Sequence, residues 1–154
     1  MPTTKPSFVY VMYIHTTPRD LWRALTDTGF IRQYWLGREN ISAWKKGSAL
    51  ESRSPDGELE WQGKIVATQP LRRLVYTFQG TESHEPPSRV TFEIETLDKK
   101  RGPQGEAVRL TVTHDRFPPR SKIFPGICEG WPVILSGLKT LLESGRGLGM
   151  TWKF

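Results

Sequence analysis

The chain has 154 residues, of which 36% are hydrophobic, and its 6 Trp, 7 Phe and 4 Tyr argue against disorder, because disordered chains lack bulky residues to bury. This length fits one domain over residues 1–154 with a substantial core, and the best apolar run, Phe8–Ile14, falls far short of the ~20 residues that a membrane span needs. Lys and Arg number 22 against 16 Asp and Glu, a net charge of +6, but the positive residues are scattered and sit near predicted turns, so no specific nucleic-acid surface is expected.

The first elements along the chain are a strand and two helices. Residues 8–14 predict a strand because they are β-branched and aromatic, although they are apolar at both parities and do not show which face points inward. Thr17 and Pro18 predict a helix start, since threonine is a favoured N-cap and proline fits the first helical position. A second start at Asp27 leads into apolar residues at helical spacing up to Trp35. We therefore expect two short helices in tandem.

From Gly47 to Asp115 the sequence alternates between apolar and polar residues, with turns between the runs. This pattern predicts one antiparallel meander with an apolar face and a solvated face, and the stretch Lys99–Gly105 predicts a polar hairpin loop. The same parity places three acidic residues on the solvated face: Glu60, Glu93 and Glu95. The expected inward positions are Leu59, Trp61, Gly63, Ile65, Ala67, Leu74, Tyr76, Phe78, Val90, Phe92, Ile94, Val108, Leu110, Val112 and His114.

Pro118 and Pro119 end the sheet pattern, and the segment that follows is expected to be irregular as far as Gly130. A helix is then predicted over Trp131–Ser144, because its apolar residues fall on one stripe and Gly145 is a favoured C-cap. A curved sheet whose apolar face is covered by one long amphipathic helix makes a two-layer α+β domain.

A search for reaction chemistry finds little. The three histidines have no metal-ligand spacing and no nucleotide-binding motif occurs, so no metal and no cofactor is expected. The single cysteine, Cys128, and the lack of an export signal predict a cytoplasmic protein. His114 is the one polar group that alternation places on the apolar face. It is either a buried histidine whose ring nitrogens bond to neighbouring backbone, or a polar anchor or proton-transfer group in a pocket.

Five segments in order resemble one family, the domains homologous to the C-terminal domain of the activator of heat shock protein 90 ATPase. The resemblance covers the chain from Phe8 to Gly145 and implies the helix-grip fold of the START-like (SRPBCC) superfamily, in which a curved antiparallel sheet wraps around a long C-terminal helix with a cavity between them. The segments are Ile14–Asp27, Arg73–Phe78, Pro87–Ile94, Leu110–His114 and Gly130–Glu143.

The leading functional hypothesis is a module that binds a hydrophobic or aromatic small molecule in that cavity. One alternative is an interaction protein that regulates a chaperone ATPase, which rests on the resemblance. Another is a cyclase- or dehydratase-like enzyme that uses His114, with Tyr76 as a partner, although no catalytic residue is assigned. A further alternative is that the same side chains simply fill the core. The candidate cavity residues are Trp35, Trp61, Tyr76, Phe78, Phe92, His114, Phe117, Trp131, Leu135 and Leu138.

Overall fold

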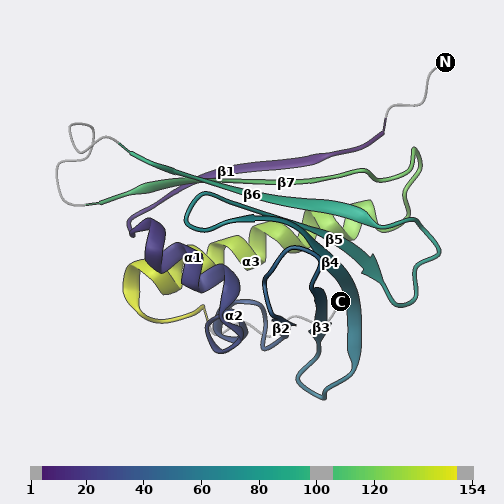
Figure 1. The fold of residues 1–154 in the computed structure, drawn as a ribbon, viewed down its shortest axis with the longest axis horizontal. Coiled ribbons are helices and arrows are strands. Elements are labelled where there is room, and N and C mark those ends of the chain that lie inside the picture. Colours follow the sequence, from purple (N-terminus) through teal and green to yellow (C-terminus); the bar gives the residue numbers. More distant parts are fainter. Residues whose placement is uncertain (1–4, 98–105, 149–154) are drawn as a thin grey trace.

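The computed structural model describes residues 5–97 and 106–148, and within these ranges the chain forms seven strands and three helices (Figure 1). The strands form one antiparallel sheet in the order β1-β7-β6-β5-β4-β3-β2. No helix in this described part is long and apolar enough to cross a membrane. The elements are β1 (Phe8–Ile14), α1 (Pro18–Thr26), α2 (Thr28–Tyr34), β2 (Glu39–Ser42), β3 (Ala49–Arg53), β4 (Leu59–Gln69), β5 (Arg73–Gly80), β6 (Ser88–Thr96), β7 (Val108–Asp115) and α3 (Phe124–Ser144).

The sheet curves around α3, and the two short helices lie on the same side of the sheet as α3 (Figure 1). This is the helix-grip α+β fold, which confirms the fold expected from the sequence. Both short helices begin where predicted: the Thr17 hydroxyl accepts a hydrogen bond from the Asp20 N–H at 3.0 Å, and the Asp27 carboxylate accepts one from the Phe30 N–H at 2.8 Å. Strand β2 was not anticipated, and the predicted loop Lys99–Gly105 lies outside the described residues.

The meander is interrupted by irregularities in β4 that the alternation rule did not foresee. Ser52 pairs with Trp61 and Arg53 pairs with Leu59, so Glu60 is the extra residue of a β-bulge. A bulge breaks the two-residue period and re-aims the side chain. The prediction that Glu60 faces solvent was therefore wrong, because its carboxylate turns toward the side chain of Arg38. Glu93 and Glu95, in the regular strand β6, are exposed as expected.

The long helix begins at Phe124, so the prediction of irregular structure up to Gly130 was wrong. Its start is stabilised by a residue distant in sequence: the Glu85 carboxylate, from the β5–β6 connection, accepts the Lys122 N–H at 2.7 Å and the Ser121 hydroxyl at 2.5 Å. A negative charge there complements the helix dipole. Pro132, the second residue of the predicted helix, lies well inside the observed one, where it has no N–H to donate. Gly145 ends the helix as predicted, with a φ of 80°.

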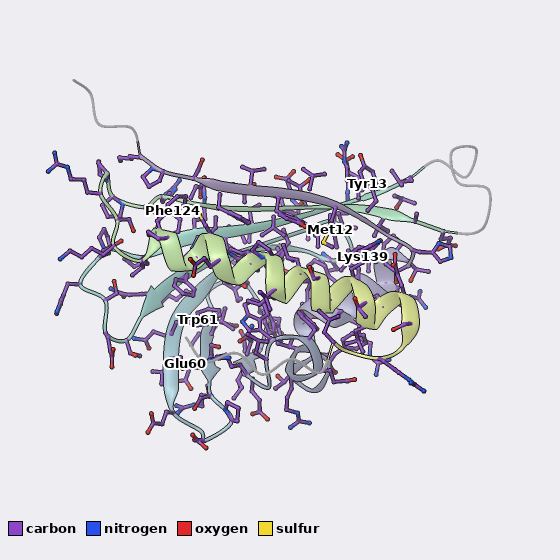
Figure 2. All side chains as sticks on the ribbon, turned by 180° about the vertical axis from the view of Figure 1, so that it is seen from behind. Met12, Tyr13, Glu60, Trp61, Phe124 and Lys139 are labelled. Atoms are coloured by element: carbon purple, nitrogen blue, oxygen red, sulfur yellow. The ribbon has the colours of Figure 1, made fainter. Side chains whose placement is uncertain are left out.

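The C-terminal half of α3 is fixed to the edge strand β1 by polar contacts. Figure 2 labels Lys139 on α3 and Tyr13 on β1. Lys139 donates from Nζ to the carbonyl of Tyr13 at 2.7 Å and to the carboxylate of Glu143 at 2.7 Å. The same carboxylate accepts the His15 N–H at 2.8 Å. These bonds satisfy backbone groups at the end of the edge strand β1. They use polar side chains of α3, and its apolar side chains pack in the core.

Leu138 tests the role of α3 as the centre of the core. Its side chain is fully buried, so Leu138→Ala should lower the free energy of unfolding by about 2–5 kcal/mol, the cost of lost burial plus a cavity. Urea melts measure this change. Leu142→Ala, at a half-buried position one turn later, is the control and should cost less. A loss below about 0.5 kcal/mol for Leu138→Ala would contradict its place in the core.

Candidate functional site

A cavity of about 280 Å³ lies between the curved part of the sheet and the N-terminal half of α3. Strands β4 and β5 supply one wall, α3 supplies the opposite wall, and the residues after α2 lie at its side. The side chains that bound it are mostly aromatic and aliphatic, with Arg38 and Glu60 the charged exceptions. The lining residues are Trp35, Arg38, Glu60, Trp61, Tyr76, Phe78, Gly80, His114, Ile123, Gly126, Ile127, Gly130, Trp131 and Ile134.

The structure divides the candidate cavity residues into two groups. Those that line the cavity are Trp35, Trp61, Tyr76, Phe78, His114 and Trp131. Those that are buried but do not line it are Phe92, Phe117, Leu135 and Leu138. The second group packs in the core, because alternation and helical spacing identify which residues point inward but not which of them border a gap.

Ile123, Gly126, Ile127 and Gly130 were missed because they lie in the segment before Trp131 that was expected to be irregular, whereas Ile134 lies in the predicted helix but was not counted among the cavity residues. Ile123, Ile127, Gly130 and Ile134 recur at intervals of three and four residues, which is the spacing of one helix face. Their apolar period is visible in the sequence once the helix is begun at Phe124. Arg38 and Glu60 carried no such signal, because a bulge and a loop position them.

The aromatic walls form a continuous cluster that runs from the sheet to the helix. Trp61 packs on Phe78 with ring centroids 4.6 Å apart, and the ring of Trp35 meets that of Trp131 edge-on at 5.4 Å. Phe78 meets the ring of His114 at 5.2 Å. Tilted and edge-on pairs at these distances are the arrangements that aromatic rings favour, so the walls are held in place by one another.

His114 is fully buried at one side of the cavity, and both of its ring nitrogens have partners. The indole N–H of Trp131 donates to Nδ1 at 3.0 Å, and Nε2 lies 2.7 Å from the hydroxyl oxygen of Ser88. Ser88 in turn bonds to the carbonyl of Phe78 at 3.2 Å. The burial confirms the sequence prediction, whereas the partners are side chains and not the neighbouring backbone.

The direction of this chain of hydrogen bonds follows from the indole, which can only donate. Nδ1 of His114 must therefore be unprotonated, and Nε2 carries the proton and donates to Ser88. Burial lowers the pKa of His114 to about 3, against the opposing effect of the Asp115 carboxylate. The imidazole is thus neutral at pH 7, with no lone pair free to accept a proton from a molecule in the cavity.

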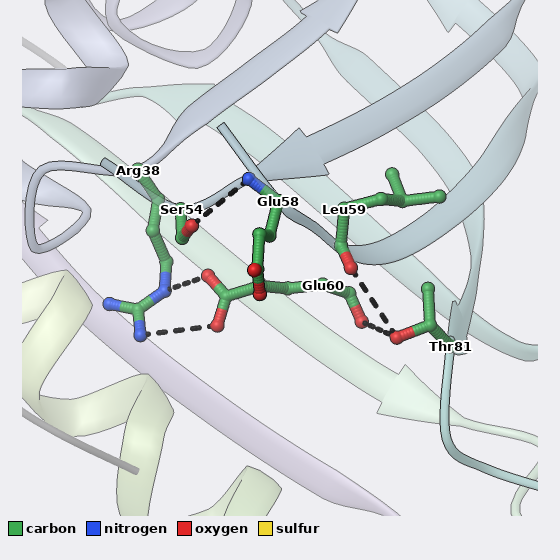
Figure 3. A network of polar contacts seen from close by, with 6 residues as sticks. All are labelled: Arg38, Ser54, Glu58, Leu59, Glu60 and Thr81. Atoms are coloured by element: carbon green, nitrogen blue, oxygen red, sulfur yellow. Dashed lines mark hydrogen bonds and ion pairs between the residues drawn. The ribbon is translucent and has the colours of Figure 1, made fainter. Parts of the chain in front are cut away.

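The charged residues of the lining neutralise each other. Nε of Arg38 lies 2.5 Å from one carboxylate oxygen of Glu60, and a second contact of 3.4 Å joins the other nitrogen and oxygen (Figure 3). The backbone carbonyl of Glu60 also accepts the Thr81 hydroxyl at 3.2 Å. The Arg38 side chain is 11% exposed and that of Glu60 33%, so Glu60 still reaches water, but the two opposite charges together present little net charge to the cavity.

No group of three or more His, Cys, Asp or Glu among residues 5–97 and 106–148 could hold a metal ion. What the described lining offers is apolar contact, flat aromatic faces and a few hydrogen-bonding groups. The hydroxyl of Tyr76 is one of them, and burial, followed by the neighbouring Tyr34, raises the pKa of Tyr76 well above its usual value, so this hydroxyl stays protonated.

The sequence over residues 15–143 matches the family described as Activator of Hsp90 ATPase homolog 1-like protein. A comparison with curated proteins gives no significant match.

Among solved structures, the Aha1 dimer from Colwellia psychrerythraea is similar, with a TM-score of 0.74, 19% identity, and coverage of 92% of this chain and 99% of that one. Protein MLL2253 from Mesorhizobium loti has a TM-score of 0.69 and 26% identity, over 89% of this chain and 96% of that one. An HSP90 activator from Plasmodium falciparum has a TM-score of 0.72 and 18% identity, over 88% of this chain and 95% of that one.

Proposed function

This chain belongs to the family of Activator of Hsp90 ATPase homolog 1-like proteins. We propose that it is a single cytoplasmic START-like domain that binds a hydrophobic or aromatic small molecule. The observation that carries the proposal is the cavity of about 280 Å³ with aromatic walls between the sheet and α3. Concave sites with apolar walls and a few polar groups are the usual form of small-molecule sites. The volume lies near the lower end of that class, which suits a compact ligand.

The polar groups of the cavity support binding over catalysis. An enzyme that used His114 would need its imidazole to take up or release a proton near neutral pH. The Trp131 indole occupies Nδ1, Ser88 occupies Nε2, and burial keeps the ring neutral. His114 is therefore proposed as a positioning residue that holds Trp131 and the β6–β7 wall in place.

A second candidate function, contact with a chaperone, is supported by the family match and by the similar structure from Plasmodium falciparum, which is described as an HSP90 activator. This role would use the outer surface and does not compete with a ligand in the cavity. Measuring the ATPase rate of an Hsp90 with and without the purified protein distinguishes it from ligand binding alone.

The cavity is tested with an uncharged fluorescent probe, N-phenyl-1-naphthylamine. We expect one probe to bind per folded chain and to quench tryptophan fluorescence, because Trp35, Trp61 and Trp131 all border the cavity. Gly126→Leu should weaken binding at least ~10-fold, since residue 126 lies on the face of α3 that lines the cavity. An added Cβ there meets no atom within 4 Å, so the fold should be preserved.

Glu129→Leu is the matched control, because it adds the same side chain at an exposed position of α3 outside the lining. It should leave probe affinity unchanged. Circular dichroism melts establish that both variants are folded. Absence of saturable binding by the wild-type protein would sink the small-molecule proposal, as would equal binding by wild type and Gly126→Leu.

A further inference from the structure

The hydrogen-bonding groups of the cavity lining differ in whether they already have a partner. Arg38 and Glu60 bond to each other, the ring nitrogens of His114 are both engaged, and the indole of Trp131 donates to His114. The Glu60 carboxylate and Nδ1 of His114 therefore each already accept a hydrogen bond.

Three donors of the lining show the opposite situation. Within residues 5–97 and 106–148, no hydrogen-bond partner is found for the indole N–H of Trp35, the indole N–H of Trp61 or the hydroxyl of Tyr76. These side chains are 7%, 6% and 2% exposed, so solvent outside the protein reaches them little. In these ranges the fully buried side-chain polar atoms without a partner are Asn40 Oδ1 and Ser52 Oγ. The three donor atoms are not among them, so they remain open to the cavity that their side chains line and can donate to a molecule bound there.

The shape of the lining adds a second constraint. The rings of Trp61 and Tyr76 are stacked, with an interplanar angle of 19° and centroids 5.8 Å apart, and the ring of Phe78, tilted by 36°, lies 4.6 Å from Trp61. A ring system can stack on or meet these aromatic faces edge-on, and it loses less conformational entropy on binding than a flexible chain does. The mutual neutralisation of Arg38 and Glu60 leaves little to attract a charged group.

Resting on the proposed function, we propose that the cavity selects a flat, uncharged aromatic molecule that carries a carbonyl or similar acceptor oxygen, and that the Tyr76 hydroxyl donates to this oxygen. Tyr76 is the least exposed of the three donors, and its ring contacts Trp61 in the cavity wall and Phe92 in the core. The lining thus supplies apolar contact for affinity and an unpaired donor for selectivity.

The test compares two probes of the same shape, 9-fluorenone, which has a carbonyl, and fluorene, which lacks it. Their affinities are measured by displacement of N-phenyl-1-naphthylamine. The wild-type protein should bind the ketone about 3- to 10-fold more tightly than the hydrocarbon, the value of one neutral hydrogen bond. In Tyr76→Phe this ratio should fall to about one because the ketone loses affinity.

Tyr34→Phe is the matched control, because the hydroxyl of Tyr34 already donates to the carbonyl of Ala24 at 2.6 Å and its side chain does not line the cavity. It should keep the wild-type ratio while lowering the melting temperature, whereas Tyr76→Phe should melt as the wild type does.

Equal affinity for the two probes in the wild-type protein, or a ratio that persists in Tyr76→Phe, overturns the inference and leaves the proposed function standing. If neither probe displaces N-phenyl-1-naphthylamine from a folded protein that binds it, the assignment of ligand class is also overturned. If N-phenyl-1-naphthylamine itself does not bind, the proposed function fails.

Discussion

Acidification from pH 6.5 to 4.5 should destabilise the folded protein by about 2–3 kcal/mol through His114 alone, because each pH unit between two pKa values changes stability by about 1.4 kcal/mol. In the folded protein, burial lowers the pKa of this histidine from its ordinary value of 6.5 to about 3. Between these two pKa values the imidazole of His114 binds a proton in the unfolded chain but not in the folded chain. The contribution of His114 to the free energy of unfolding is therefore complete above pH 6.5, the pKa of histidine in the unfolded chain, and it decreases as the pH falls toward 3.

His114 does not bind a second proton in the folded protein because of the direction of its hydrogen bond with Trp131. A proton on Nδ1 of His114 would face the indole N–H, so two donors would meet at 3.0 Å. The imidazolium thus loses a hydrogen bond in addition to its hydration. Urea melts at several pH values measure the slope, and histidine NMR titration should show one ring that stays neutral down to about pH 4.

His114→Gln should remove the share of this slope that His114 contributes between pH 6.5 and 4.5, because a glutamine does not titrate. His84→Gln, which removes an exposed imidazole, is the matched control and should retain the wild-type slope. Carboxyl groups begin to titrate at the acidic end of this window, and the pKa values of Asp115 and Glu143 are lowered in the folded protein. Their contribution is common to the wild type and both variants, so the difference from His114→Gln isolates the share of His114. A wild-type stability that is flat over this window would contradict the buried, neutral state of His114.

Gly63→Ala should lower the free energy of unfolding by about 3 kcal/mol or more, or prevent folding, because the added methyl group has no room. A Cβ on residue 63 would lie 1.8 Å from the backbone carbonyl oxygen of Thr77 on the neighbouring strand β5. That oxygen belongs to a strand of the sheet and cannot move away as the tip of a side chain can. At this point the Lys64 N–H bonds to the Thr77 hydroxyl at 2.9 Å, which draws the two strands together.

Gly80→Ala is the control for a glycine replacement in the same sheet. Its added Cβ would meet the Cβ of Ser83 at 3.6 Å, an ordinary contact, so only a small change in stability is expected. Denaturant melts of both variants decide the matter. Equal stability of Gly63→Ala and Gly80→Ala would contradict the close approach of β4 and β5. It would also contradict the curvature of these strands, which forms the cavity wall.

The sequence alone determined those features of this protein that depend on neighbours along the chain. Thr17 and Asp27 start helices because a side-chain oxygen reaches an N–H three residues later, and Gly145 ends α3 because it adopts a positive φ at little cost. Alternation also placed His114 inside, since regular strands turn every second side chain to the same face.

Only the tertiary structure decided where α3 begins, where Glu60 points and which inward residues border a cavity. Glu85 holds the segment that leads into α3, a bulge against β3 turns the side chain of Glu60, and the gap depends on how tightly β4 and β5 bend around α3. Each of these features results from a contact between segments far apart in the chain. Periodicity reports which residues are buried, but the space left between them is set by the packing of whole elements.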